Sequence, residues 1–163
     1  MSFQTTKINN ADKPSFYRLL NQQAKGLLHG EEDLIACAAN FSSLLFHSME
    51  QVNWVGFYLF KSQSLILGPF QGQVACSQIP LDEGVCGTAF SQNKTLRIAD
   101  VNAFKGHIVC DTASASELVV PLNINGETVG VLDIDSPILD RFDEDDQLGC
   151  EQLALTFCQI LSN

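Results

Sequence analysis

The segment from Glu117 to Asp135, ELVVPLNINGETVGVLDID, constrains the fold more than any other part of this chain. Two apolar runs flank the dipeptide Asn125-Gly126, which supplies the left-handed backbone dihedrals that a two-residue turn requires. The segment therefore predicts an antiparallel hairpin whose two strands meet at that turn. A chain that contains this hairpin is expected to fold around a sheet with antiparallel pairing.

Further strands are predicted on the N-terminal side of the hairpin. β-branched and aromatic residues fill NWVGFYLF (53–60) and LILGPF (65–70), which a short KSQS turn joins, and TLRIAD (95–100) is a third candidate. The remaining stretch before the hairpin is long and rich in loop residues. Together these patterns predict a mainly antiparallel sheet with a loop-rich insertion.

Helices are predicted at both ends of the chain. Three segments have apolar residues at helical spacing, namely residues 12–30, 31–50 and 144–162. The apolar positions include Ile35 in the second segment and Leu148 and Leu155 in the third. The order of elements predicts an α+β fold, in which N-terminal and C-terminal helices pack on one face of the sheet.

Length and charge limit the classes of partner. The 163 residues carry 9 basic and 19 acidic side chains, and the net charge of -10 repels phosphate backbones and anionic membrane surfaces. We therefore expect neither nucleic acid nor membrane as a partner.

The first residues lack the apolar core of a signal peptide, and polar residues interrupt the apolar segment that follows Leu34. The expectation is a soluble, cytoplasmic protein with a single domain over residues 1–163.

The six cysteines include no C-x-x-C pair. Neither a zinc ribbon nor a thioredoxin-type redox motif is therefore predicted. Cys37, Cys150 and Cys158 lie within the predicted helices, where a cysteine usually acts as a small buried apolar residue. We assign these three no function.

The other three cysteines, Cys76, Cys86 and Cys110, lie in segments punctuated by Gly, Pro, Ser and Thr. Reactive groups concentrate on loops that a rigid sheet supports, but loop cysteines need not meet in space, so structural and chemical roles both stay open. Cys110 has the strongest case, because the polar run after it can offer backbone N–H groups to a thiolate. Asp111 opposes that effect, and His107 fits a structural role better than that of a general base.

Three acids are predicted to converge at one end of the hairpin. Asp133 and Asp135 are two residues apart on its second strand, so their side chains point to the same face. Glu117 begins the first strand, and the two-residue turn returns it to the neighbourhood of Asp135. These acids are either solvated groups at a strand end or the mouth of a pocket that binds an ammonium group or delivers a proton.

Trp54, the single tryptophan, and Tyr58 are four residues apart in the strand NWVGFYLF. This spacing places both rings on one face of the strand. A role in the core is the default for two such rings, and the wall of a ligand pocket is the alternative.

Several of these stretches, taken together, resemble the free methionine-(R)-sulfoxide reductases, a family of GAF-domain proteins. The resemblance covers about residues 53–137 and continues more loosely into FDEDD. Its motifs are NWVGFYLF, LGPFQGQVAC, GVCG, GHIVCD, SASELVVPL and GVLDIDSP. Generic GAF domains share the fold and the hairpin but lack the three spaced cysteines, so the resemblance is specific. It implies that the sheet and helices form a single GAF-like domain.

The resemblance implies a role for each of the three loop cysteines. Cys110 matches the residue generally assigned as the nucleophile, and Cys76 matches the thiol that resolves its sulfenic acid by forming a disulfide. Cys86 matches a residue with a supporting or alternative role, and it stays a second candidate for the nucleophile.

The resemblance also implies a substrate site. Glu117, Asp133 and Asp135 match acids that bind the ammonium group of the substrate and help to protonate its sulfoxide oxygen. Trp54 matches the aromatic wall of that site, with Tyr58 near it.

The expected activity is reduction of free L-methionine-(R)-sulfoxide, with thioredoxin as the reductant that resets the disulfide. No metal and no organic cofactor is expected, and a homodimer is possible. Two alternatives without turnover stay open. One is a GAF sensor of a small molecule, and the other is a thiol sensor whose output is the Cys76–Cys110 disulfide.

Overall fold

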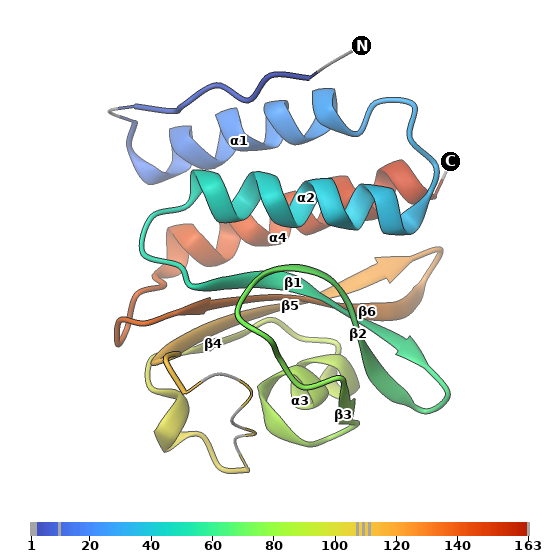
Figure 1. Ribbon diagram of the computed structural model, residues 1–163, viewed down its shortest axis with the longest axis vertical. Helices are drawn as coiled ribbons and strands as arrows, with labels where there is room; N and C mark the ends of the chain where they lie inside the picture. Colours follow the sequence, from blue (N-terminus) through green and yellow to red (C-terminus); the bar gives the residue numbers. More distant parts are fainter. Residues whose placement is uncertain (1–2, 10, 107, 109, 111, 163) are drawn as a thin grey trace.

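A central sheet separates two unequal layers in the computed structural model, which describes residues 3–9, 11–106, 108, 110 and 112–162. Helices α2 (Leu34–Ser48) and α4 (Glu144–Leu161) lie against one face of the sheet, and α1 (Lys13–Leu27) covers them from outside (Figure 1). Helix α3 (Gly84–Gln92) and the long connections lie on the opposite face, and β3 (Gln78–Pro80), an edge strand of the sheet, lies next to α3. The predicted α+β class, with N-terminal and C-terminal helices on one face, is confirmed.

Helices α1, α2 and α4 begin at side chains that satisfy their first N–H groups, whereas α3 has no side-chain cap. Asp12 accepts a hydrogen bond from the Ser15 N–H at 2.8 Å, and Asp33 accepts one from the Ala36 N–H at the same distance. Asp143 forms a reciprocal capping box with residue 146. The helices are α1 (Lys13–Leu27), α2 (Leu34–Ser48), α3 (Gly84–Gln92) and α4 (Glu144–Leu161).

The sheet has the strand order β3-β2-β1-β6-β5-β4, and every neighbouring pair is antiparallel. Its strands are β1 (Trp54–Lys61), β2 (Ser64–Gly72), β3 (Gln78–Pro80), β4 (Leu96–Ile98), β5 (Ser116–Ile124) and β6 (Glu127–Ser136). Asn125 and Gly126 have φ values of 53° and 84°, as the predicted turn requires. The predicted hairpin is therefore confirmed as β5–β6.

Three expected core residues face away from the core. Ile35, Leu148 and Leu155 are exposed, at 55%, 57% and 49% of their surface. Helix α4 turns Leu153 and Phe157 toward the sheet, and Leu148 and Leu155 fall on the opposite side of that helix. The apolar spacing therefore predicted a buried surface on α2 and on α4 that is wider than the one in the structure.

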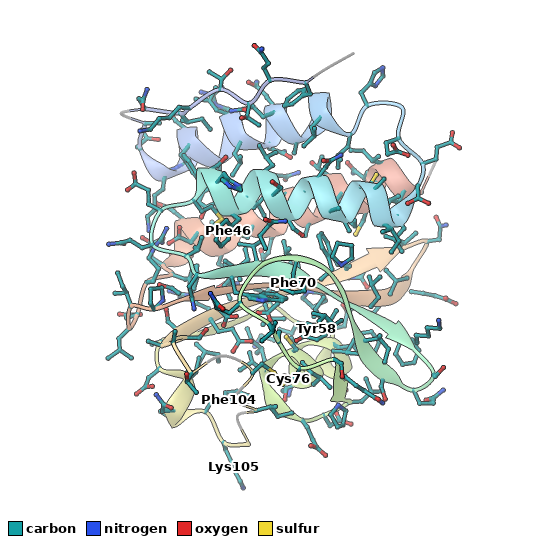
Figure 2. All side chains as sticks on the ribbon, viewed as in Figure 1. Phe46, Tyr58, Phe70, Cys76, Phe104 and Lys105 are labelled. Carbon is teal, nitrogen blue, oxygen red and sulfur yellow. A yellow bond between two sulfur atoms is a disulfide. The ribbon has the colours of Figure 1, made fainter. Side chains whose placement is uncertain are left out.

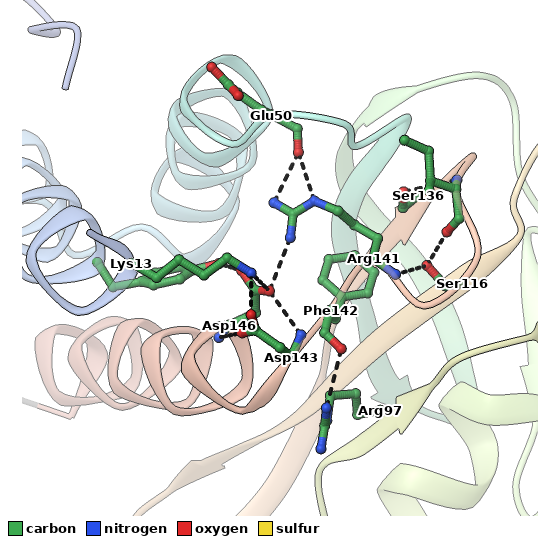
Figure 3. Close-up of polar contacts among 11 residues, drawn as sticks. Lys13, Glu50, Arg97, Ser116, Ser136, Arg141, Phe142, Asp143 and Asp146 are labelled. Carbon is green, nitrogen blue, oxygen red and sulfur yellow. Dashed lines mark hydrogen bonds and ion pairs between the residues drawn. The ribbon is translucent and has the colours of Figure 1, made fainter. Parts of the chain in front are cut away.

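A buried polar cluster joins the helical layer to the end of the sheet (Figure 3). Asp146, 1% exposed, accepts hydrogen bonds from the Tyr17 hydroxyl at 2.7 Å, Lys13 Nζ at 2.6 Å and Arg141 Nη1 at 3.0 Å. Arg141 also donates from Nε and Nη2 to the carbonyl oxygen of Glu50. These contacts fix the connection from β6 to α4.

No helix within the described part of the chain is long and apolar enough to cross a membrane.

Candidate active site

The candidate site lies on the face of the sheet opposite the three long helices. Tyr58 and Cys76 lie on this side of the sheet in Figure 2, near α3. A small cavity of about 30 Å³ opens there between α3, the end of the β5–β6 hairpin and the loop before β5. Its lining residues are Ile79, Gly84, Val85, Cys86, Ile108, Cys110, Ser114, Glu117, Asp133 and Asp135.

A disulfide joins Cys76 to Cys110 at the edge of this cavity. The two residues are 34 positions apart, and their Cα atoms are separated by 5.2 Å. The bond ties the segment after β2 to the loop before β5. It is the pair that the family resemblance implied. His107 and Asp111, whose roles the sequence left open, lie outside the described residues.

Cys86 lies in helix α3 rather than in an exposed loop, so the expectation of a loop cysteine is wrong for this residue. The helix begins at Gly84, whose φ of 61° suits glycine and whose N–H donates to the Gly106 carbonyl at 3.2 Å. Only 3% of Cys86 is exposed, and its Sγ donates to Glu117 Oε1 at 3.8 Å. This thiol is therefore held against the acid cluster.

The three predicted acids converge in the cavity. Glu117 and Asp135 are directly opposite each other in the β5–β6 ladder, and Asp133 follows on the same face of β6. Glu117 is 5% exposed and Asp133 is 6% exposed. The interpretation as solvated acids at a strand end is therefore wrong for these two, because the loops and α3 cover the end of the hairpin.

Trp54 and Tyr58 share one face of β1, as their spacing predicted, and their rings stack with centroids 5.9 Å apart. Trp54 Nε1 donates to the Gln73 carbonyl at 3.1 Å, and the Tyr58 hydroxyl donates to the Cys76 carbonyl at 3.0 Å. Both rings are buried, and neither is among the described residues that line the cavity. They therefore position the segment that carries Cys76, and their contact with a ligand stays a prediction.

A larger cavity of about 1040 Å³ lies on the helical side, between the N-terminal segment, α1 and α2. Its buried acid, Asp146, already pairs with Lys13 and Arg141. No cysteine is found among its described lining residues. The smaller cavity is the better candidate for chemistry, because a thiol, a disulfide and three acids meet there.

Comparison with known proteins shows the family of this chain. The family model described as GAF domain matches residues 41–161. A protein of Escherichia coli (strain K12) named free methionine-R-sulfoxide reductase is 46% identical over 151 residues, which are 93% of this chain and 92% of that protein. This chain belongs to the free methionine-(R)-sulfoxide reductase family of GAF-domain proteins. The expected family and the expected class of enzyme, an oxidoreductase, are confirmed.

Solved structures of other reductases extend the similarity to the whole fold. The free methionine-R-sulfoxide reductase from Neisseria meningitidis, in complex with its substrate, superposes with a TM-score of 0.93 at 38% identity, covering 98% of this chain and 96% of that one. The fRMsr of Staphylococcus aureus, also in complex with substrate, gives a TM-score of 0.87 at 47% identity, covering 96% and 99%. The predicted GAF-like fold is confirmed.

Burial and crowding of like charges perturb the acids of this reductase site. Burial first, and the neighbouring Asp133 and Asp135 second, raise the pKa of Glu117 well above its usual range. Burial raises the pKa of Asp133 from 3.8 to about 6. Burial and the same carboxylates raise the pKa of the Cys86 thiol well above its usual value of 9.0. Glu117 and Cys86 therefore keep their protons near neutral pH.

Asp133→Asn is expected to stabilise the fold at high pH and not at low pH. The raised pKa means that folding disfavours the charged form, so wild-type stability falls as pH rises from 3.8 to about 6 and then stays low. The free energy of unfolding of the variant should exceed that of the wild type by on the order of 2 to 3 kcal/mol at about pH 8, and by little at about pH 4.

Urea unfolding at several pH values measures this difference. Glu127→Gln, a change of an exposed acid on the same strand, is the matched control and should show no such growth with pH. A pH-independent difference, or a destabilised Asp133→Asn, would contradict the assignment of a strained buried acid.

The sequence patterns do not predict parts of the cavity wall. Gly84 and Val85 lie at the start of α3, where the local sequence is typical of a loop, and no sequence pattern indicates Ser114 or Ile108. The left-handed Asn93, which ends α3 with a φ of 45°, was a usable signal for a helix end. Ser114 had no comparable signal, because its position depends on the path of the loop.

Proposed function

We propose that this chain reduces free L-methionine-(R)-sulfoxide to L-methionine, with Cys110 as the nucleophile and Cys76 as the resolving thiol. The observation that carries the proposal is the Cys76–Cys110 disulfide at the edge of a cavity that holds three carboxyl groups. Reduction of a sulfoxide needs a thiolate beside a proton donor in a site shielded from water. This cavity brings both kinds of group together.

The acids divide into two roles by their protonation. Glu117 keeps its proton near neutral pH, because burial and two neighbouring carboxylates raise its pKa, and it donates that proton to the sulfoxide oxygen. Asp133, with a pKa of about 6, is charged near neutral pH, and it binds the substrate's ammonium group together with Asp135. The Trp54 and Tyr58 rings form the apolar wall near the methyl group and the side-chain carbons.

The chemistry then proceeds in two steps at the cysteines. The Cys110 thiolate attacks the sulfoxide sulfur, the S–O bond breaks as the oxygen is transferred, and methionine leaves with Cys110 as a sulfenic acid. The Cys76 thiol attacks the sulfenic sulfur, forms the disulfide and releases the oxygen as water. Two electrons and two protons from a thioredoxin dithiol restore both thiols by exchange.

Cys86 has a supporting role in this scheme. Its thiol donates a hydrogen bond to Glu117 and has a strongly raised pKa, so it is a poor nucleophile near neutral pH. It holds the Glu117 carboxyl group in position.

Substrate binds to the dithiol form of the protein. A cavity of about 30 Å³ is far below the roughly 300 Å³ or more of ordinary ligand pockets. Breaking the Cys76–Cys110 bond frees the segment after β2 to move away from the cavity. Methionine therefore leaves before the disulfide closes the site.

Cys76→Ser is expected to release one equivalent of methionine and then stop when thioredoxin is the reductant. Without the resolving thiol, the Cys110 sulfenic acid has no intramolecular partner, whereas a small dithiol can reduce it directly. Methionine release is measured with each reductant. Equal multiple-turnover rates for wild type and variant with thioredoxin would show that Cys76 is not required.

The test of the function itself is coupled turnover. A reductase consumes one NADPH per sulfoxide in the presence of thioredoxin and thioredoxin reductase, whereas a GAF sensor or a thiol redox sensor does not. Binding of the sulfoxide without NADPH consumption would favour the sensor. A homodimer and a cytoplasmic location stay predictions, which light scattering and fractionation of cells would test.

A further inference from the structure

Three potential metal ligands meet at the floor of the cavity. The Sγ atom of Cys86, a carboxylate oxygen of Glu117 and a carboxylate oxygen of Asp133 all lie within 4.8 Å of one another. They come from three separate elements, α3, β5 and β6, and all three residues are buried. The framework of the sheet and helix, rather than a flexible loop, sets these positions.

A second observation concerns one oxygen atom of this cluster. Asp133 Oδ1 is buried, has no hydrogen-bond partner among the described residues, and belongs to a side chain that lines the cavity. A buried carboxylate oxygen without a partner costs several kcal/mol in general. The Asp133 carboxylate therefore favours a cationic ligand.

We propose that the Cys86 thiolate, Glu117 and Asp133 bind one Zn²⁺ ion. One sulfur and two carboxylate oxygens, with a fourth position for water, form a ligand set that zinc accepts in tetrahedral geometry. Zinc–sulfur and zinc–oxygen bonds at tetrahedral angles separate such ligands by roughly 3.6 Å. The separation of Cys86 Sγ and Glu117 Oε1 is 3.8 Å.

The size and chemistry of the cavity distinguish among cations. A volume of about 30 Å³ accommodates an ion with one water, but not an amino acid. Mg²⁺ and Ca²⁺ require six or more oxygen ligands, which the sulfur and the small space do not provide. Binding adds two positive charges to a crowded group of acids.

The ion would inhibit the reductase, and this consequence rests on the proposed function. Zn²⁺ takes the proton donor Glu117 and the Asp133 carboxylate, the groups proposed to act on the substrate. It is therefore an inhibitory ion and not a cofactor of the reaction.

Cobalt provides a direct probe of the ligands. The disulfide form of the protein is titrated with Co²⁺, which replaces Zn²⁺ and absorbs in the near ultraviolet when a thiolate binds it. We expect one equivalent of Co²⁺ to produce that band together with the visible bands of a four-coordinate ion, and one equivalent of Zn²⁺ to remove both. Cys76 and Cys110 cannot contribute, because they are disulfide-bonded.

Variants identify the ligands. Cys86→Ser should abolish the thiolate band, and Glu117→Gln should weaken Co²⁺ binding by more than about 100-fold, since loss of even outer-shell partners costs about 10- to 100-fold. Asp135→Asn is the matched control. It removes a charge from the same cavity but lies outside the ligand cluster, so it should keep the band. A band that persists in Cys86→Ser, or no band in the wild type, would overturn the site.

Turnover distinguishes this inference from the proposed function. With free Zn²⁺ set by a metal buffer, NADPH consumption should fall as Zn²⁺ rises and recover as sulfoxide is added. A cobalt band that depends on Cys86, combined with turnover that Zn²⁺ does not affect, would support the metal site and contradict the proposed placement of the substrate on Glu117 and Asp133.

Discussion

Cys110→Ser is expected to lower single-turnover release of methionine by more than about 1000-fold. A serine hydroxyl is far less acidic and less nucleophilic than a thiol near neutral pH, so it cannot attack the sulfoxide sulfur at a useful rate. The protein is reduced, mixed with one equivalent of free methionine-(R)-sulfoxide and quenched at intervals, and methionine is measured by chromatography. In the reduced wild-type protein Cys110 is not part of a disulfide. Its replacement by serine therefore removes no cross-link, and we expect the fold to be preserved.

Two further cysteine variants make this result specific. Cys37→Ser changes a buried thiol in α2, far from the cavity, and should leave methionine release unchanged. Cys86→Ala should slow release, because Glu117 loses a hydrogen-bond donor, but should not abolish it. Near-normal release by Cys110→Ser together with none by Cys86→Ala would make Cys86 the nucleophile.

The sheet could be predicted from the sequence because its signals are local. Asn125-Gly126 defines a turn whose dihedrals the structure reproduces, and that turn brings Glu117 close to Asp135. The exact pairing of Glu117 with Asp135 also depends on a register shift between Leu122 and Asn123, which no sequence pattern indicated. The approach of the three acids was therefore predictable, but the pairing that places all three on one face was not. Their burial was not, because it depends on loops and on α3, which cover the end of the hairpin from elsewhere in the chain.

Helix α3 could not be predicted from local patterns. It is short, contains small residues and glycine, and packs on β5 and β6. At Gly87 the backbone passes so close to the Pro80 carbonyl that a side chain has no room. The local sequence thus resembles a loop, and tertiary packing stabilises the helix. This is why Cys86 was expected in a loop and not at the floor of the cavity.

The pairing of Cys76 with Cys110 also could not be derived from the residues alone. Three cysteines lay in loop-like segments, and nothing in their spacing chose a pair. Only the family resemblance implied the disulfide. In the structure, hydrogen bonds from the Tyr58 hydroxyl and from Trp54 Nε1 hold the backbone near Cys76. A sequence pattern does not reveal such long-range contacts.

Specificity for the free amino acid gives the second large expected effect. N-acetylation of methionine-(R)-sulfoxide should lower kcat/KM by roughly 30- to 5000-fold, which corresponds to about 2 to 5 kcal/mol for leaving buried acids without their charged partner. Asp133 lines the cavity and has a buried carboxylate oxygen without a hydrogen-bond partner among the described residues, so the substrate's ammonium group is the cation proposed to pair with it. An acetylated nitrogen carries no charge and adds bulk to an enclosed space.

The comparison uses kcat/KM for the free and acetylated (R) forms, with the free (S) epimer as a control for stereochemistry. The Asp133→Asn variant makes this comparison more specific, because removing the carboxylate should lower kcat/KM for the free substrate much more than for the acetylated one. The ratio between the two substrates should therefore shrink in the variant. Comparable kcat/KM values for both (R) forms in the wild type would contradict the ammonium site, even if Cys110 proved to be the nucleophile, because thiol attack does not require charge on the substrate nitrogen.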